Sequence, residues 1–210
     1  KKIKPQAGSI IINTSTISPS LSDKLNRDLN DNGIEYVDAP VLGSLPAAEK
    51  GSLKFLLKLN KTPLNKIKDL IQSLGSDYRI IIKSKTAQEI KLFHNTLCAI
   101  VIVSVSKFLI SSSKFQTDGK EVYESFKFGA LNCDLIKAKQ KMFSDLIFEP
   151  LFPLKLMYKD INTLIIDLEK SNIYDSLINS VRDDYKNALS EFGDLDCASI
   201  YKYFSDYNDK

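Results

Sequence analysis

The chain has 210 residues, 43% hydrophobic and 26% charged, which is the balance of a globular protein rather than a disordered or fibrous one. Its 29 Lys and Arg and 26 Asp and Glu give a net charge of +3, with the two signs interleaved. Nucleic-acid binding would require a clustered basic face, so that class is disfavoured. The most apolar stretch, 97–103, is closely flanked by Lys91, His94 and Lys107, and we expect a buried helix there, with no membrane span.

The three cysteines, Cys98, Cys133 and Cys197, lack the spacing of metal ligands, and the single histidine, His94, has no neighbouring ligand type in the sequence. We therefore expect no metal site. The residues after Lys1 do not follow the order of a secretory signal, and the odd number of cysteines is typical of a reducing compartment. The expected location is the cytoplasm.

The first third of the chain alternates between strand and helix patterns. A β-branched run at 9–13 predicts a strand, and a second strand is expected at 34–38. Between them, Ser18 is a candidate N-cap and Pro19 a first helical residue, and leucines at four-residue spacing predict a helix that ends at 32–33.

The alternation continues with a strand at 53–59, a helix from 62 to Gly75 and a strand at 78–83. Four strands with only two full helices predict an incomplete layered α/β sheet over residues 1–84.

From about residue 85 the strand pattern disappears. A long apolar helix is expected to run close to Phe115, followed by helices near 120–129, 131–146, 154–170 and 174–192. Residues 85–210 are therefore predicted to form an all-α domain. Because 97–103 is apolar nearly all round, other helices or a second subunit must cover it.

Three features could carry chemistry. Lys91 and Asn95 are four residues apart and so share one face of the long helix, although a polar stripe facing solvent has the same spacing. Residues 38–44 are a strand end followed by a turn, where α/β sheets bind ligands, although a structural turn looks the same. Lys159 and Asp160 open a helical stretch and, by themselves, predict a solvated ion pair.

Taken in order, these segments resemble the signatures of the β-hydroxyacid dehydrogenase family. The family includes 3-hydroxyisobutyrate dehydrogenases and glyoxylate or succinic semialdehyde reductases, and is similar to 6-phosphogluconate dehydrogenase. The matching segments are Asn13–Pro19, Asp38–Val41, Lys91 with Asn95, Lys159-Asp160 and, at the C-terminal end, Gly193–Ile200. The resemblance therefore extends over essentially the whole chain.

The resemblance implies the late strands of a Rossmann-type NAD(P)-binding domain followed by an all-α C-terminal domain. It implies that Lys91 is the catalytic acid/base and that Asn95 orients the substrate. Thr16 would lie near the nicotinamide, and Lys159 would approach the NADP or NAD cofactor. A small hydroxyacid substrate and a homodimer or homotetramer formed through the helical domain are implied as well. From composition and charge, no nucleic-acid or membrane partner is expected.

The sequence also departs from the family pattern. Leu42, Gly43 and Ser44 stand where the family has a Ser-Gly-Gly turn that binds the substrate carboxylate, and residues 83–88 contain none of the glycines usual before the catalytic lysine. His94 replaces a usual asparagine. The eight glycines are all at least eight residues apart, so the chain contains no Gly-x-Gly-x-x-Gly phosphate-binding loop.

These departures leave alternatives open. The leading hypothesis is a piece of an NAD(P)-dependent hydroxyacid dehydrogenase or reductase that has been separated from its nucleotide-binding half and is inactive alone. The second is a non-catalytic relative that kept the fold as a dimerising interaction module. The third is an unrelated protein with accidental matches. A Gly-x-Gly-x-x-Gly segment encoded upstream in frame would favour the enzyme.

Overall fold

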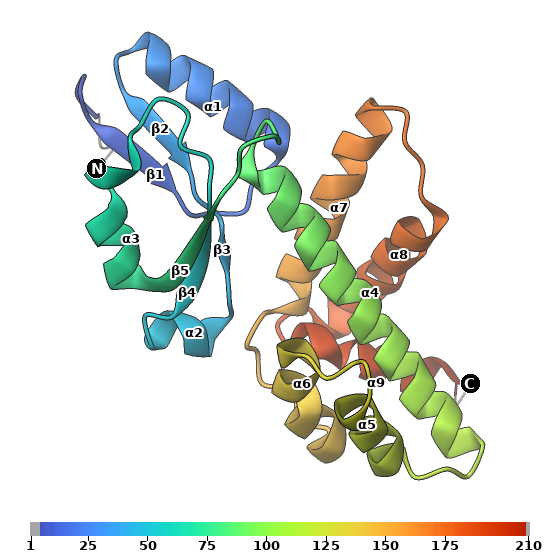
Figure 1. Cartoon of the computed structure of the whole chain (residues 1–210). Coiled ribbons are helices and arrows are strands. Elements are labelled where there is room, and N and C mark those ends of the chain that lie inside the picture. Colours follow the sequence, from blue (N-terminus) through green and yellow to red (C-terminus); the bar gives the residue numbers. More distant parts are fainter. Residues whose placement is uncertain (1–4, 209–210) are drawn as a thin grey trace. The chain divides into compact units, whose positions relative to one another are not determined.

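The computed structural model describes residues 5–208, which divide into two compact units. The first unit contains the residues up to His94 together with Thr163–Tyr174, and the second contains Asn95–Asn162 together with the residues from Asp175 onward. Two helices, α4 (Ala87–Lys114) and α7 (Leu154–Lys170), contribute residues to both units (Figure 1). The predicted boundary after residue 84 stays a prediction.

The first unit contains two small sheets. Their strands are β1 (Ile10–Asn13), β2 (Glu35–Asp38), β3 (Val41–Leu42), β4 (Leu53–Leu57) and β5 (Gly75–Ile80). β1 and β2 are parallel, with Ile10 opposite Glu35, whereas β4 lies between antiparallel β3 and parallel β5. A bridge between Asp38 and Lys58 joins the two sheets at the end of β2.

Helices pack on these strands. They are α1 (Pro19–Asp31), α2 (Leu45–Glu49), the 3-10 helix η1 (Leu64–Lys66) and α3 (Lys68–Leu74). α1 packs against β2 and α3 against β5 (Figure 1). The predicted N-cap is confirmed, because the Ser18 hydroxyl accepts the Leu21 N–H at 3.2 Å. Val37, Phe55 and Ile71 form part of the core under these helices.

α4 is the long helix that the apolar spacing predicts. We expected no stretch suited to cross a membrane. By length and composition alone this was wrong, because α4 is long and apolar enough to do so. Core helices of globular proteins pass the same test, and Leu92, Ala99 and Ile102 on α4 are buried. The composition of α4 is therefore weak evidence for a membrane span.

In the described part of the second unit, the regular elements are helices. Besides its parts of α4 and α7 it contains α5 (Gly119–Phe128), α6 (Asp134–Asp145), α8 (Ser176–Phe192), the 3-10 helix η2 (Cys197–Ser199) and α9 (Ile200–Asn208). α5 packs against α6, and α8 against α9 (Figure 1). Tyr185 and Ile200 are completely buried here, and the Tyr185 hydroxyl donates to the Cys197 carbonyl at 3.1 Å. Burial raises the pKa of Tyr185 well above 10, so its phenol stays neutral.

A buried ion pair fixes the segment before α7. The Lys139 ammonium on α6 lies 2.6 Å from Asp196 Oδ1, and both side chains are almost fully buried. Asp196 Oδ2 also accepts the N–H groups of Leu151 and Phe152, at 3.0 and 3.1 Å. One carboxylate therefore connects α6, the chain before α7 and η2.

Four elements differ from the sequence-based predictions. β3 and α2 were not predicted, because a two-residue strand and a five-residue helix are shorter than the patterns that reveal them. β5 begins at Gly75, where only a helix end was expected, and stops three residues before the predicted end. Most of β5 is exposed, so it lacks the apolar pattern of a buried strand. α9 lies beyond the last predicted helix.

Candidate active site

The end of β2 is fastened to the beginning of α4 by a buried carboxylate. Asp38 Oδ2 accepts the backbone N–H groups of Ala87 at 2.8 Å and Gln88 at 3.2 Å. These N–H groups belong to the first turn of α4, which has no partners for them within the helix. The positive end of the helix dipole also favours a negative charge at this point.

The Gln88 side chain connects this carboxylate to the loop after β1. Its Nε2 donates to Asp38 Oδ1 at 2.6 Å and to the Ser15 carbonyl at 3.0 Å, and its Oε1 accepts the Ile17 N–H at 3.0 Å. Thr16, the predicted nicotinamide neighbour, lies between these two loop residues and is half-buried. The loop that carries Thr16 is thus bound on both sides by one amide.

Tyr36 and Ser22 form a further pair of buried polar groups in the first unit. The Tyr36 hydroxyl lies 3.1 Å from Ser22 Oγ and accepts from Asn13 Nδ2 at 3.1 Å. Burial raises the pKa of Tyr36, although the hydrogen bond with Ser22 partly offsets this effect, so its phenol is neutral at neutral pH. Burial also raises the pKa of Asp38, while the hydrogen bonds from Gln88 and Ala87 act in the opposite direction.

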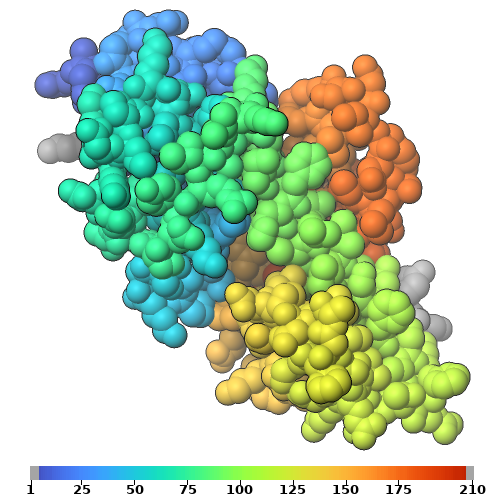
Figure 2. All heavy atoms as spheres, viewed as in Figure 1, coloured from blue at the N-terminus to red at the C-terminus, as the bar shows by residue number. Residues whose placement is uncertain are grey.

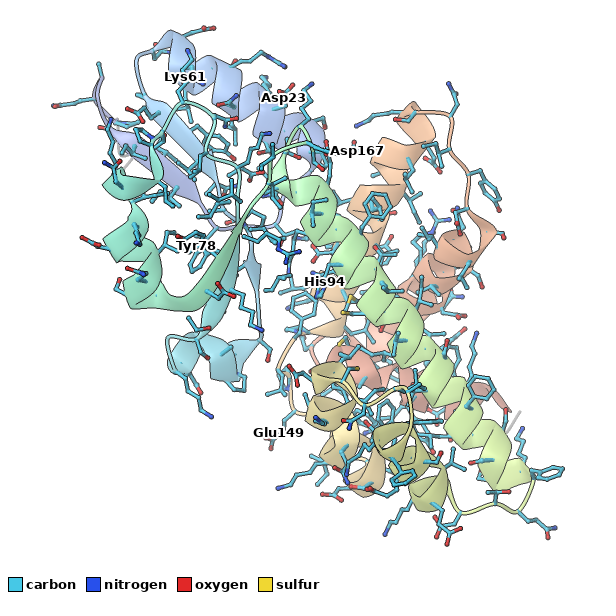
Figure 3. All side chains as sticks on the ribbon, in the orientation of Figure 1. Asp23, Lys61, Tyr78, His94, Glu149 and Asp167 are labelled. Carbon is cyan, nitrogen blue, oxygen red and sulfur yellow. The ribbon has the colours of Figure 1, made fainter. Side chains whose placement is uncertain are left out.

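Lys91 lies three residues beyond Gln88, in the first turns of α4. Lys91 is 7% exposed and Asn95 6%, which disagrees with the alternative of a polar stripe facing solvent. His94 is labelled on α4 in Figure 3. Burial and the Lys91 ammonium both lower the pKa of His94, so its ring is neutral at neutral pH and the cation of this turn is Lys91.

The turn predicted to bind a carboxylate connects β3 to α2. Gly43 has φ +123°, and a Cβ there would lie 2.9 Å from the Ala47 Cβ, so this position requires glycine. Ser44 occupies the N-cap position of α2, but its hydroxyl makes no capping hydrogen bond. Leu42 is the last residue of β3 and is half-buried. The turn therefore offers a hydroxyl that the helix does not use.

In the second unit, one carboxylate contacts two of the predicted site residues. Asp160 on α7 is almost fully buried, and its Oδ2 accepts Asn95 Nδ2 at 2.6 Å. Its Oδ1 lies 2.9 Å from the Lys159 ammonium. The prediction of a solvated pair was therefore right for half-exposed Lys159 and wrong for Asp160, whose burial the sequence does not indicate.

The structure thus gathers four of the predicted site residues in two sets, and the turn at residues 42–44 belongs to neither. In the first unit, Gln88 links the Thr16 loop to the helix that carries Lys91, and in the second unit Asp160 holds Asn95 and Lys159. Sequence reasoning missed Gln88 and the anchoring role of Asp38. The only signal in the sequence was that Asp38 belongs to one family motif and that Gln88 lies three residues before Lys91 of another.

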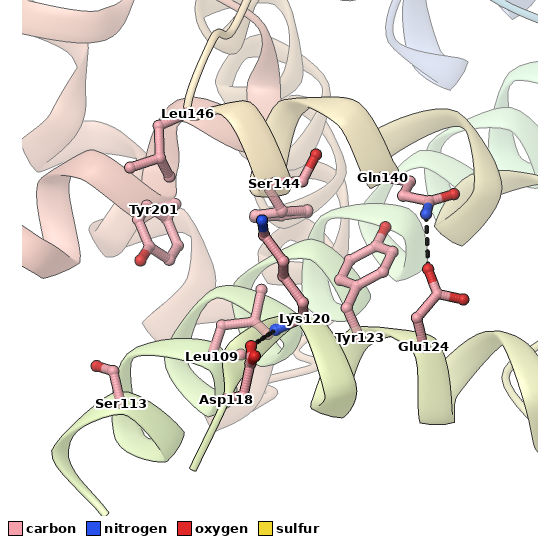
Figure 4. A pocket seen from close by; sticks show the side chains of 12 residues that line it. Leu109, Ser113, Asp118, Lys120, Tyr123, Glu124, Gln140, Ser144, Leu146 and Tyr201 are labelled. Carbon is pink, nitrogen blue, oxygen red and sulfur yellow. Dashed lines mark hydrogen bonds between the residues drawn. The ribbon is translucent and has the colours of Figure 1, made fainter. Parts of the chain in front are cut away.

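Neither of two surface hollows in the second unit is lined by a predicted site residue. The first, about 300 Å³, is lined by Tyr123, Phe143 and Tyr201 and by the charged side chain of Lys120 (Figure 4). The second, about 490 Å³, has mainly apolar walls that include Phe108 and Phe115. Among residues 5–208, no three His, Cys, Asp or Glu side chains are grouped as a metal site would require.

Two family models match the chain. One, described as the NAD binding domain of 6-phosphogluconate dehydrogenase, matches residues 2–94. The other, described as NAD-binding of NADP-dependent 3-hydroxyisobutyrate dehydrogenase, matches residues 86–204, more than half of the chain. These two matches place the chain in a class of NAD(P)-dependent oxidoreductases.

Individual relatives agree with the family models. The chain is 26% identical to 2-hydroxy-3-oxopropionate reductase of Escherichia coli over 74% of this chain and 53% of the relative. It is 32% identical to mouse mitochondrial 3-hydroxyisobutyrate dehydrogenase over 51% of this chain and 31% of the relative. The solved 3-hydroxyisobutyrate dehydrogenase of Mycobacterium tuberculosis with L-serine has a TM-score of 0.85, with 17% identity, covering 95% of this chain and 71% of that one.

The chain belongs to the β-hydroxyacid dehydrogenase family, whose members are NAD(P)-dependent dehydrogenases and reductases. It spans about half the length of the Escherichia coli reductase.

The residues of the chain fit only part of a dinucleotide. The loop Ser15–Ile17 follows a parallel strand, where this class of fold binds the cofactor. No two glycines are closer than eight residues, so the chain has no glycine-rich loop that could surround a diphosphate. The chain therefore has a loop where this class of fold binds the cofactor, but no segment with the usual phosphate-binding pattern.

Proposed function

We propose that this chain is part of an enzyme that transfers a hydride between NAD(P) and a small β-hydroxyacid, such as 3-hydroxyisobutyrate, or the corresponding aldehyde acid. The α/β unit would be the late part of a Rossmann-type domain, which the family match over residues 2–94 supports. The observation that carries the proposal is a buried lysine, Lys91, three residues beyond the amide that holds the Thr16 loop.

In this proposal Lys91 is the proton donor and acceptor. The cofactor, NADP or NAD, supplies or accepts the hydride when bound. The Lys91 ammonium donates a proton to the substrate oxygen during reduction, and its amine removes the hydroxyl proton during oxidation. Because Lys91 is buried, its nitrogen is shielded from bulk water, which strengthens its electrostatic effect on the reacting oxygen.

The other residues bind and orient. Asn95 lies one helical turn beyond Lys91 and would orient the substrate, while its Nδ2 stays bound to Asp160. The turn at residues 42–44 would bind the substrate carboxylate through the Ser44 hydroxyl, with Gly43 allowing close approach of backbone. Thr16 and Lys159 would contact the cofactor.

The substrate or cofactor site also requires groups that this chain lacks. A diphosphate needs a phosphate-binding loop, and the 210 residues contain none of the usual form. We therefore expect these 210 residues to be inactive when expressed alone.

We also propose that the protein assembles as a homodimer or homotetramer through its helical part. Phe108 on α4 and Phe115, the residue that follows α4, are 65% and 84% exposed, and Leu97 on α4 is exposed as well. Figure 2 shows the C-terminal part of α4, in yellow-green, at the surface of the second unit. Large exposed apolar side chains that recur along one helix are typical of an interface between subunits.

The proposal is tested on the protein expressed from its full reading frame. A panel of small hydroxyacids that includes 3-hydroxyisobutyrate is assayed with NAD+ and NADP+ for the wild type, Lys91→Met and, as a control, exposed Lys83→Met. We expect Lys91→Met to lower kcat by about 10²- to 10⁴-fold and Lys83→Met to leave it unchanged. Equal rates for Lys91→Met and the wild type would contradict the role of Lys91.

The absent phosphate-binding loop and Leu42 in the carboxylate turn favour a second candidate function. In that case the protein would be a non-catalytic relative that keeps the helical part as a dimerising module. An oligomeric protein that shows no turnover with any hydroxyacid, and whose full reading frame lacks a Gly-x-Gly-x-x-Gly segment, would support this alternative.

A further inference from the structure

We propose that Gln88 is a positioning residue that fixes the Thr16 loop relative to the turn of α4 that carries Lys91. The inference rests on the proposed function, because it concerns the distance between the acid/base residue and the loop expected beside the nicotinamide. All groups involved lie in the first unit.

The first step of the argument is that the hydrogen-bonding capacity of the Gln88 amide is used on all sides. Both hydrogens of Nε2 have acceptors, Asp38 Oδ1 and the Ser15 carbonyl, and Oε1 accepts the Ile17 N–H. Two oxygens face the nitrogen and one N–H faces the oxygen, so the amide can be oriented in only one way. Gln88 is completely buried, which gives the side chain no solvent-exposed alternative.

The second step is that no other residue type would make the same bonds. An apolar side chain would remove a hydrogen-bond partner from the Asp38 carboxylate, the Ser15 carbonyl and the Ile17 N–H. The loss is costly above all at Asp38, which is buried. A glutamate would lose the donors and place a second carboxylate beside buried Asp38. The site therefore requires a neutral group that donates two hydrogen bonds and accepts one.

The third step connects this network to the chemistry. Gln88 and Lys91 are three residues apart in one helix, about 4.5 Å along its axis, so a fixed Gln88 fixes the start of the Lys91 side chain. The same amide holds both flanks of Thr16. A displacement of about 1 Å between reacting groups can cost about 10² in rate. Gln88 is thus expected to affect turnover without touching the reacting atoms.

The experiment uses the full-reading-frame protein and three variants, Gln88→Leu, Gln88→Glu and Gln72→Glu. Gln72 is exposed on α3 and gives a matched control for the introduced charge. The first readout is independent of activity, namely hydrogen exchange of the Ile17 amide measured by NMR. The Glu35 N–H, which donates to the Ser9 carbonyl at 2.9 Å and does not contact Gln88, is the reference for intact folding.

We expect Gln88→Leu to raise the exchange rate of the Ile17 amide by about tenfold or more relative to Glu35, since one hydrogen bond is lost. Steady-state kinetics provide the second readout. We expect kcat to fall by about 10²-fold in Gln88→Leu, with little change in the KM for the hydroxyacid, because geometry is impaired and substrate contacts are kept.

The pH profile provides a signature that a purely structural role would not produce. In Gln88→Glu, two carboxyls share one buried site and cannot both ionise, so the introduced group retains its proton to a higher pH than usual. When protonated it donates to Asp38 and accepts from Ile17, which restores two of the three bonds. The kcat of Gln88→Glu relative to wild type should therefore rise as pH falls, whereas the ratios for Gln88→Leu and Gln72→Glu should stay flat.

The outcomes separate this inference from the proposed function. An unchanged Ile17 exchange rate in folded Gln88→Leu would overturn the coupling, and lost protection with an unchanged kcat would overturn the positioning role in an active enzyme. A wild-type protein without turnover would refute the proposed function and, with it, any effect of Gln88 on catalysis. The Ile17 exchange result would still show whether the Gln88 amide binds the loop.

Discussion

At the scale of single residues, each unit depends on a buried carboxylate that carries several hydrogen bonds. Asp38 receives two backbone N–H groups and the Gln88 amide in the first unit. Asp196 receives the Lys139 ammonium and backbone N–H groups in the second. Because a buried charge is stable only when its lone pairs are satisfied, removal of a single partner should be costly.

The first prediction compares two aspartates that are two residues apart. Asp196→Asn removes the charge that pairs with buried Lys139, and we expect the free energy of unfolding of the helical unit to fall by about 3–5 kcal/mol. Asp194→Asn breaks the exposed pair with Lys155 and should change it by less than about 1 kcal/mol. Urea unfolding followed by far-UV circular dichroism measures both values, and equal losses would show that burial does not determine the difference.

Some of these residues could be predicted and others could not. Ser18 and Pro19 were identified because a helix start depends on neighbours in the sequence. Gln88 was not, because its partners Asp38 and Ser15 lie 50 and 73 residues away. The burial of Asp160 was missed for the same reason, since its partner Asn95 is 65 residues distant.

At the scale of elements, the pairing of β4 with β5 depends on close packing at Gly75. A Cβ at this position would collide with the Leu53 carbonyl oxygen and lie 2.7 Å from Phe55 Cε2. Gly75 also ends α3, so the chain passes from helix to strand without a connecting loop. The backbone of Gly75 is extended, which any residue can adopt, so the role of this glycine is steric.

Two glycine substitutions should change the free energy of unfolding in opposite directions. Gly75→Ala is expected to lower the free energy of unfolding by about 1–3 kcal/mol or more, because backbone atoms must shift to admit the methyl group. Gly119→Ala at the start of α5 meets nothing closer than 3.9 Å and should raise it by about 0.4–1 kcal/mol, since it restricts the unfolded chain. Denaturant midpoints of the two variants test this, and a loss of stability in Gly119→Ala similar to that in Gly75→Ala would contradict the steric explanation.

Periodic apolar spacing predicted the long elements well. α1, α4 and α7 were each predicted within about two residues of their ends, because they carry long apolar faces or clear caps. β3, α2 and η2 contain two to five residues each, which is too short for a periodic pattern. Their positions depend on tertiary contacts that a single sequence does not display.

At the scale of the whole molecule, the family is fixed by models that together match residues 2–204, while the function of the complete protein rests on proposals. The ordered set of motifs predicted the family, because their order and spacing are properties of the sequence. The candidate site was predicted as a list of residues, and the structure adds the contacts of Gln88 and Asp160, which depend on folding.

The assembly proposal makes a prediction at this scale. We expect the full-reading-frame protein to sediment as a dimer or tetramer, and Phe108→Asp to weaken the association about 30-fold or more by placing a charge in an apolar interface. Phe128→Asp changes a still more exposed phenylalanine at the end of α5 and serves as the control. Sedimentation velocity over a range of concentrations gives the oligomeric state. A monomeric wild type would contradict the proposal.

The role of Lys91 in proton transfer is tested most directly by chemical rescue. In the full-reading-frame protein, Lys91→Ala removes the amine and leaves a space in a buried position, and kcat is measured with increasing concentrations of methylamine. We predict that kcat falls by about 10²- to 10⁴-fold and that the added amine restores part of it in a saturable manner. A folded Lys91→Ala variant that retains wild-type kcat, or loses it with no recovery at any amine concentration, would contradict the assignment.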